Sequence, residues 1–221
     1  MYYVLSDNNV KIAVYDPNPA GNPSLLMLHG WPLCSKMYEY QIKFLTARGF
    51  RCVTMDFRGF GQSDAPGEGY GYTQMARDVC AVVQSLNVPS VVLAGFSMGG
   101  AIAIRCMSLF SGYKVSKLAL LSTAAPSYTI RPGYPFGTNT EATNELIDNL
   151  RLNRPKAIRA FGENFFAKDH GEDFDGWFYR LNLEASPQGT THGAMALRDE
   201  DLRADMANIH VPTGILHGKK T

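Results

Sequence analysis

The sequence has no run of apolar residues that approaches the roughly 18 residues needed to cross a bilayer as a helix. It also has no excess of charge of either sign, because 21 lysines and arginines stand against 20 aspartates and glutamates. No basic stripe or block of like charges is present, which argues against nucleic acid or a membrane surface as a partner. Met1–Val10 shows no basic region followed by an apolar stretch, so no signal peptide is evident and we expect a cytoplasmic location.

Cysteine is scarce, with four residues in a chain of 221. Their spacing matches neither a metal site nor a disulfide framework, so we expect reduced and mostly buried thiols. The four are Cys34, Cys52, Cys80 and Cys106. Hydrophobic residues make up 45% of the chain and charged residues 19%, which excludes an extended disordered protein.

Short, uninterrupted apolar runs recur along the chain, as is typical of parallel strands that are buried on both faces. These runs are residues 25–28, 52–55, 91–94, 118–121 and 214–216. A hairpin is expected before them, because β-rich residues 2–5 and 10–15 flank the turn sequence Ser6-Asp7-Asn8-Asn9.

Segments with helical periodicity alternate with these apolar runs. We expect Ser35 to cap a first helix that ends near Gly49. We expect Thr73 to cap a second helix that ends at Asn87, and a third helix to run from Met98 to about Phe110. Strands and helices in this order imply right-handed crossovers and an α/β fold with a doubly wound, mostly parallel sheet.

The alternation breaks between residues 125 and 197, where helix-like segments at 144–152 and 155–166 are accompanied by many aromatic residues. We interpret this region as a helical insertion over the carboxyl edge of the sheet. The chain then divides into residues 1–124, 125–197 and 198–221. The aromatic residues either form the core of the insertion or contact a ligand, and a lid can do both.

The strongest chemical signal is Gly95-Phe96-Ser97-Met98-Gly99, which follows one apolar run and opens an apolar helix. This strand-turn-helix setting is the one that a nucleophile elbow requires. A serine on such a tight turn projects its hydroxyl into a cleft, and the amide of Met98 at the helix start faces a developing oxyanion. The alternative is an ordinary loop in which Ser97 only caps the helix.

Two other segments end neighbouring strands of the predicted sheet. His29-Gly30-Trp31-Pro32 follows one strand, in the place where a second backbone amide of an oxyanion hole would come from. Taken alone, His29 is expected to be a structural loop histidine. Asp56 and Arg58 follow the next strand and are expected to form a buried loop clamp rather than an acid-base pair.

Together these motifs resemble the α/β-hydrolase superfamily, and within it the serine esterases and cofactor-free haloperoxidases (perhydrolases). The matching segments are residues 29–32, 56–64, 95–100 and 209–218. The resemblance implies Ser97 as nucleophile, the backbone amides of Trp31 and Met98 as the oxyanion hole, and residues 125–197 as a helical cap. It implies no cofactor and no metal. Haloalkane dehalogenases and epoxide hydrolases of this fold carry aspartate at the elbow, so Ser97 argues against them.

The sequence departs from this family at the catalytic acid, whose expected position holds Thr221. Threonine cannot carry the charge that stabilises an imidazolium. The catalytic histidine is expected farther downstream, and a final strand and helix are also expected there. We therefore expect that a C-terminal piece is missing or is a separate polypeptide, which would leave residues 213–216 as an open, apolar sheet edge. The other histidines are expected to be structural or exposed, namely His170, His192, His210 and His217.

The resemblance implies hydrolysis of small carboxylic esters or lactones through an acyl-serine intermediate, with hydrogen peroxide able to replace water and give peracids. Two other functions stay open. One is a non-catalytic small-molecule receptor of the same fold, which the absence of an evident acid and base favours. The other is hydrolysis of carbon–carbon bonds by the same serine. A C-terminal fragment or a second copy of the chain remains a possible protein partner.

Overall fold

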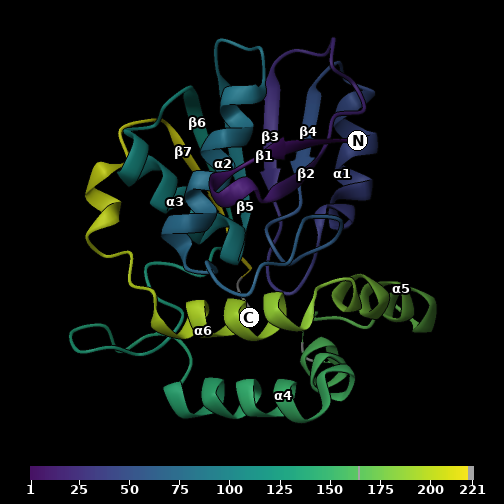
Figure 1. Cartoon of the computed structure of the whole chain (residues 1–221), viewed down its shortest axis with the longest axis vertical. Coiled ribbons are helices and arrows are strands. Elements are labelled where there is room, and N and C mark those ends of the chain that lie inside the picture. The colour runs from purple at the N-terminus through teal and green to yellow at the C-terminus, as the bar shows by residue number, and fades with distance from the viewer. Residues whose placement is uncertain (164, 219–221) are drawn as a thin grey trace.

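A seven-stranded, mostly parallel sheet forms the centre of the molecule in the computed structural model, which describes residues 1–163 and 165–218. The strands follow the order β1-β2-β4-β3-β5-β6-β7, with β1 and β2 antiparallel and the others parallel (Figure 1). Their bounds are β1 (Tyr2–Leu5), β2 (Lys11–Tyr15), β3 (Ser24–Leu28), β4 (Arg51–Met55), β5 (Val91–Phe96), β6 (Val115–Leu121) and β7 (Thr213–Leu216). The predicted hairpin and doubly wound sheet are confirmed.

Helices cover both faces of this sheet. The α-helices are α1 (Glu39–Thr46), α2 (Tyr72–Ser85), α3 (Met98–Phe110), α4 (Thr140–Glu163), α5 (Glu172–Leu183) and α6 (Pro187–Asp199). Three 3-10 helices are η1 (Asp7–Asn9), η2 (Ser35–Tyr38) and η3 (Asp205–Asn208). No helix among the described residues combines the length and the apolarity that a membrane crossing requires.

Strand β3 shows why its sequence is continuously apolar. Side chains alternate between the two faces of a strand. Leu26 and Leu28 join the main core with α2 and α3, whereas Met27 packs on the opposite face in a smaller cluster that includes residues of α1. Both faces of β3 are therefore covered, so side chains that point to either face are apolar.

Two of the predicted helix starts are wrong. Ser35 begins η2 instead of capping a helix, and its backbone N–H donates to Asp56 Oδ1 at 2.7 Å. Thr73 lies inside α2, where its hydroxyl accepts a hydrogen bond from Arg105. The backbone N–H of Tyr72, at the start of α2, donates to Glu200 Oε1 at 2.8 Å. Partners distant in sequence thus take the place of local caps.

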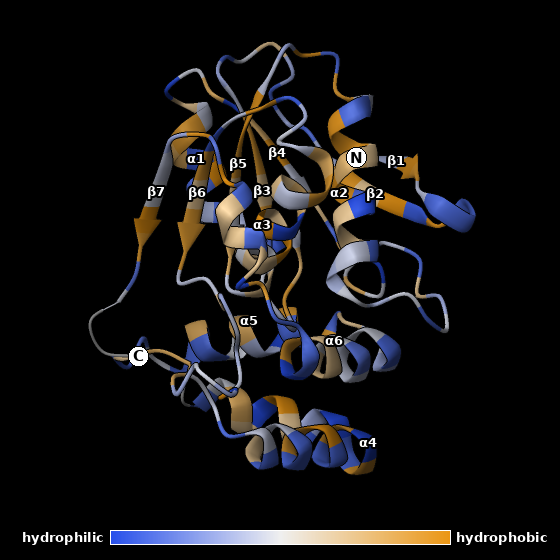
Figure 2. Ribbon diagram, turned by 90° about the vertical axis from the view of Figure 1, so that its left-hand side faces the viewer, coloured by the Kyte–Doolittle hydropathy of each residue, from blue (hydrophilic) through white to orange (hydrophobic). Residues whose placement is uncertain are grey.

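Helices α4, α5 and α6 lie beyond the carboxyl ends of the strands, on the side toward which the arrowheads of β6 and β7 point (Figure 2). The two predicted segments at 144–152 and 155–166 fall largely within α4, which is interrupted by non-helical backbone at Asn153. Pro155 follows this break, and proline has no N–H to donate within a helix. The predicted helical layer over this edge is present, and α5 and α6 add two helices that the pattern did not separate.

Strand β7 forms one edge of the sheet among the described residues, and all four of its residues are exposed. Ile215 and Leu216 have 70% and 62% of their surface exposed. The open, apolar edge that the sequence predicts at this strand is therefore observed.

Candidate active site

Ser97 stands between the end of β5 and the start of α3, as the motif predicts. Its backbone has φ 50° and ψ −117°, a conformation that costs free energy for a residue with a side chain. Neighbouring backbone groups hold it there: Ser97 N–H donates to Leu121 O at 3.0 Å, and Ala124 N–H donates to Ser97 O at 3.2 Å. A strained serine fixed in this way is typical of functional sites.

Two glycines of the motif are required by close backbone approach. A Cβ on Gly95 would stand 2.5 Å from the backbone nitrogen of Gly100. A Cβ on Gly99 would overlap the backbone oxygens of Leu28 and His29 at the end of β3. The absence of side chains therefore allows the turn to close and α3 to start directly beside β3.

The backbone that follows β3 passes beside Ser97. A Cβ on Gly30 would lie 3.1 Å from the Cβ of Ser97, so the loop that contains Gly30 and Trp31 passes next to the serine. Within residues 1–163 and 165–218, the backbone amides of Trp31 and Met98 donate to no protein acceptor. An oxyanion role for these two amides stays a prediction.

The side chain of Trp31 connects this loop to the helical layer. Its indole Nε1–H donates to Thr190 O in α6 at 2.9 Å, and its ring meets Phe161 of α4 edge to face, with centroids 4.9 Å apart. The residue is 3% exposed. The position of the Trp31 backbone amide consequently depends on contacts with α4 and α6.

His29 is structural, in agreement with the prediction. The ring is fully buried, Phe57 N–H donates to its Nε2 at 3.0 Å, and its Nδ1 lies 2.9 Å from Gly30 O. Because Nε2 accepts, the proton of the neutral ring is on Nδ1. Burial lowers the pKa of His29, although the nearby Asp56 carboxylate acts in the opposite direction. Both ring nitrogens are occupied, so His29 cannot take a proton from Ser97.

Asp56 and Arg58 are both buried, but they do not pair with each other as predicted. The Asp56 carboxylate accepts from the backbone N–H groups of Ser35 and Gln62 at 2.7 and 2.9 Å, which ties the loops after β3 and β4 together. Arg58 instead forms two hydrogen bonds of 2.7 Å with Asp78 in α2. This second pair was missed because residues 58 and 78 share no motif.

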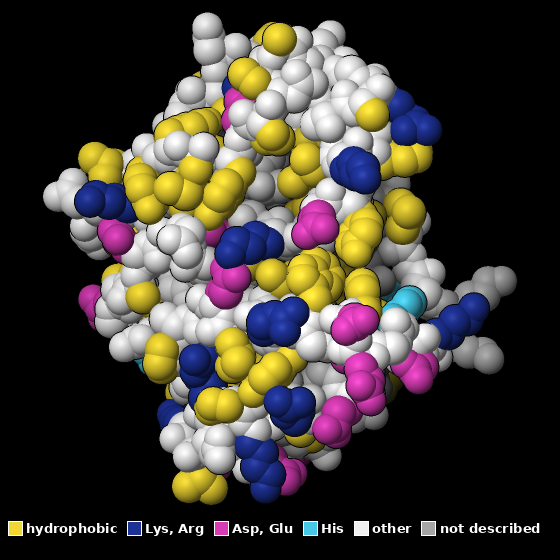
Figure 3. Space-filling view, turned by 90° about the vertical axis from the view of Figure 1, so that its right-hand side faces the viewer, with side chains coloured by type: hydrophobic (Ala, Val, Ile, Leu, Met, Phe, Trp, Pro, Cys, Tyr) yellow, Lys and Arg dark blue, Asp and Glu magenta, His cyan; other side chains and the backbone are white. Residues whose placement is uncertain are grey.

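Ser97 lines a cavity of about 880 Å³ between the carboxyl end of the sheet and α5. Aromatic side chains dominate its wall, namely Tyr38, Tyr40, Phe96, Phe165, Phe166, Phe174, Trp177 and Phe178. Figure 3 shows that apolar side chains are abundant on the face that carries α1 and α5, with charged side chains interspersed among them. The predicted aromatic cluster therefore includes cavity-lining residues, and one of them, Phe178, is also buried in a core cluster.

Ser122 and His217 also line this cavity, a position that no motif in the sequence indicated. Ser122 follows β6 and has φ 40°. His217 follows β7 and has an exposed side chain. No histidine is hydrogen-bonded to the Ser97 hydroxyl in the described part of the chain, and Thr221, at the expected position of the acid, lies outside the described residues.

The cysteines are free thiols, and three of them are buried. Burial and the adjacent Asp56 carboxylate raise the pKa of Cys34 to about 12, so this thiol stays protonated near neutral pH. Within the described ranges, no group of three or more His, Cys, Asp or Glu side chains is placed to hold a metal ion.

Comparisons with known proteins agree with this geometry. The family model for the alpha/beta hydrolase fold matches residues 23–150. The AB hydrolase superfamily protein YisY of Bacillus subtilis is 49% identical over 219 residues, which cover 99% of this chain and 81% of that protein. The bifunctional esterase/perhydrolase DCH of Acinetobacter calcoaceticus is 29% identical over 225 residues, with coverage of 99% and 82%.

A solved structure extends the similarity to three dimensions. The esterase from Exiguobacterium antarcticum superimposes with a TM-score of 0.96 at 44% identity, and the match covers 99% of this chain and 81% of that one. The family match, the 49% identical relative and the shared fold lead to one conclusion. The chain belongs to the alpha/beta hydrolase fold family and is a hydrolase.

Proposed function

We propose that this hydrolase cleaves small carboxylic esters or lactones through an acyl-serine intermediate on Ser97. The observation that carries the proposal is the position of Ser97. It lies on a strained turn at the wall of a large apolar cavity, and the nearby backbone amides of Trp31 and Met98 donate to no protein acceptor within the described residues. The esterase names of the relatives support the same class of reaction.

In the proposed mechanism, Ser97 Oγ attacks the ester carbonyl carbon while its proton passes to a base. The carbonyl π electrons move to the oxygen, which accepts hydrogen bonds from Trp31 N–H and Met98 N–H. Each such donor is worth roughly 100- to 1,000-fold in rate, and the positive end of the α3 dipole adds to the effect. The tetrahedral intermediate collapses, the alcohol leaves with a proton, and water then releases the acid and restores Ser97.

The base for Ser97 is proposed to come from outside the described residues, as is the acid that orients it. His29 is excluded by its two hydrogen bonds. His217 shares the cavity with Ser97 and is the described histidine that a test must address. Without a proton acceptor, a serine hydroxyl is a weak nucleophile.

The wall of the cavity supports small apolar esters as substrates. Phe96 precedes Ser97 in the chain, and the ring centroids of Phe96 and Phe165 are 6.1 Å apart. Such surfaces bind apolar acyl and alcohol groups and exclude water from the acyl-enzyme. Attack of hydrogen peroxide in place of water would give a peracid and leave Ser97 unchanged, an activity that the name of the Acinetobacter relative supports.

We further propose that residues 125–197 act as a helical cap over the site. Three contacts join this region to the segments that follow β3 and β4. The indole of Trp31 donates to Thr190 O, the backbone N–H of Ser186 donates to Gly59 O at 2.8 Å, and Lys36 pairs with Glu184 at 2.7 Å. The cap would then both close the cavity and position the loop after β3 that contains Trp31.

Hydrolysis of 4-nitrophenyl acetate and butyrate tests the proposal. Ser97→Ala is expected to reduce turnover to the background rate while the melting temperature stays within a few degrees of wild type. Ser85→Ala removes an exposed hydroxyl from α2 and serves as the matched control with unchanged turnover. Equal turnover by Ser97→Ala and wild type would refute the assignment. His217→Gln is expected to retain turnover, and a loss as large as that of Ser97→Ala would assign the base to His217.

A further inference from the structure

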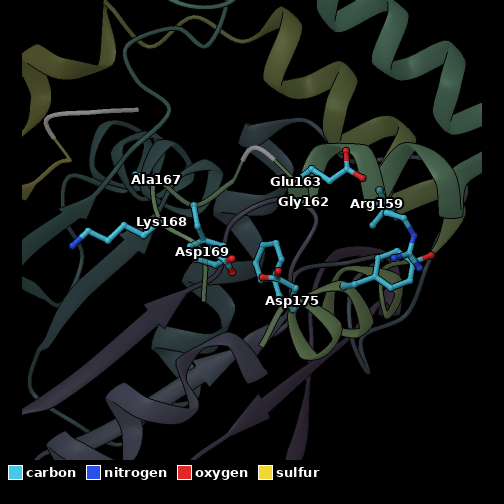
Figure 4. A pocket seen from close by; sticks show the side chains of 11 residues that line it. Arg159, Gly162, Glu163, Ala167, Lys168, Asp169 and Asp175 are labelled. Carbon is cyan, nitrogen blue, oxygen red and sulfur yellow. The ribbon is translucent and has the colours of Figure 1, made fainter. Parts of the chain in front are cut away.

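A second cavity of about 410 Å³ lies in the groove between α4 and α5, behind the aromatic wall of the Ser97 cavity. We call it the outer pocket. Its lining residues are Ile158, Arg159, Gly162, Glu163, Phe166, Ala167, Lys168, Asp169, Asp175, Phe178 and Tyr179. Figure 4 shows Arg159 and Glu163 on one side of this pocket and Lys168 and Asp169 on the other.

Phe166 and Phe178 line both cavities, so these two rings form the partition between them. Their centroids are 4.9 Å apart, in edge-to-face contact. Phe165 continues the wall toward the nucleophile, because its ring lies 4.6 Å from Phe178 and 6.1 Å from Phe96. A row of aromatic rings thus runs from the residue before Ser97 to the outer pocket.

The two rings of the partition differ in how firmly they are held. Phe178 is 5% exposed and belongs to a core cluster with Leu33 and Leu181. Phe166 is only partly buried and contacts His170 and Phe174 through its ring edges. Truncating Phe178 would remove core packing, whereas truncating Phe166 opens its part of the partition at lower cost in stability.

The outer pocket has an apolar floor where it meets the partition and a charged rim toward solvent. Ile158 is buried, and Tyr179 lies beneath the Arg159 guanidinium, 4.2 Å from the ring centroid. A methylene chain that passed Phe166 would therefore gain apolar contacts on the far side. A chain that extends from Ser97 along this row of rings would meet the Phe166 ring before the outer pocket.

We propose that Phe166 is a specificity-determining residue that sets the longest acyl chain accepted at Ser97, and that the outer pocket becomes a binding site for the distal methylenes of a straight-chain acyl group when this ring is removed. The inference rests on the proposed esterase function. It adds the substrate class, which is straight-chain carboxylic esters with acyl chains that end at the Phe166 ring.

The test compares 4-nitrophenyl esters from acetate to decanoate with wild type and Phe166→Ala. In wild type, kcat/KM should rise with chain length and then fall once the chain reaches the partition. In Phe166→Ala the maximum should move to longer chains, with about a fourfold gain for each methylene that enters the outer pocket. The ratio of the decanoate to the butyrate value is thus expected to rise at least about tenfold.

Tyr179→Ala is the matched control, since it enlarges only the outer pocket and leaves the partition intact. It should keep the wild-type chain-length profile. If Phe166→Ala proves unstable by circular dichroism, Phe166→Leu tests the same shift with less loss of packing. A wild-type profile in a folded Phe166 variant, or the same shift in Tyr179→Ala, would overturn the inference.

Binding of straight-chain carboxylates, from butanoate to decanoate, separates this inference from the proposed function. Isothermal calorimetry should show that Phe166→Ala gains affinity for decanoate relative to butanoate by the same factor as in catalysis, and this readout needs no turnover. A wild-type protein that binds these carboxylates but hydrolyses no ester would refute the esterase proposal alone. An unchanged decanoate-to-butanoate affinity ratio in folded Phe166→Ala would refute the role of Phe166.

Discussion

His29 provides a sharp test of the electrostatics beneath the site. Its ring is fully buried, with Nε2 accepting from Phe57 N–H, so protonation of Nε2 would direct an N–H group against another N–H group. Burial lowers the pKa of His29 in the folded state below its ordinary value of about 6.5. Between these two pKa values the unfolded chain binds a proton that the folded chain does not. Stability should therefore be complete above pH 6.5 and decline as the pH falls below it.

The size of the decline follows from the linkage. One proton of difference changes the free energy of unfolding by at most about 1.4 kcal/mol per pH unit. Above pH 6.5 the His29 ring is mostly neutral in both states and hardly affects stability. Between pH 7.5 and pH 5.5, His29 therefore lowers the free energy of unfolding by up to about 1.4 kcal/mol, nearly all of it below pH 6.5. Urea unfolding at the two pH values, followed by circular dichroism, measures this difference.

His29→Gln removes the titration but keeps a polar side chain, so the loss between pH 7.5 and 5.5 should shrink by up to about 1.4 kcal/mol. His210→Gln replaces an exposed histidine by the same residue and serves as the matched control for the substitution itself. In a nuclear magnetic resonance titration of wild type, the ring resonances of His29 should change at a lower pH than those of an ordinary histidine, because burial lowers its pKa. An unchanged pH dependence in His29→Gln, or a normal titration of the ring, would refute the reasoning.

Three further variants test other parts of the structure. Trp31→Phe removes the hydrogen bond to Thr190 O. Because the loosened Trp31 amide would act in the transition state, kcat for ester hydrolysis should fall about tenfold while KM stays within about twofold of wild type. A roughly tenfold rise in KM with unchanged kcat would contradict this. Arg58→Met leaves the Asp78 carboxylate buried without its cation, so the free energy of unfolding in urea should fall by about 3–5 kcal/mol. A decrease below about 1 kcal/mol would show that water reaches the carboxylate. Ser186→Ala removes the side chain that caps α6, so the free energy of unfolding in the same assay should fall by about 1 kcal/mol. An unchanged free energy of unfolding would contradict this.

The sheet and the turn that carries Ser97 could be predicted because their signals are local. Strand β3 is apolar at every position since both of its faces are covered, and Ser97 stands between a strand and a helix within one short motif. The requirement for Gly95 and Gly99 also follows from the turn itself. Local sequence therefore determined the elements and the backbone that presents the serine hydroxyl.

The parts that could not be predicted depend on contacts between distant residues. Arg58 pairs with Asp78 rather than with Asp56, and no periodicity connects those positions. The backbone N–H of Tyr72 at the start of α2 donates to Glu200, which follows it by more than 100 residues. The partition forms where Phe166, between α4 and α5, meets Phe178 of α5. Such pairings are set by packing and leave no pattern in the sequence.

The central claim is that Ser97 is an activated nucleophile. The most direct measurement is the intact mass of the folded protein after exposure to diisopropyl fluorophosphate, followed by peptide mapping of the adduct. The account predicts a single adduct, located on Ser97 and absent from Ser97→Ala. A folded protein that takes up no adduct, or an adduct that persists in Ser97→Ala, would contradict it.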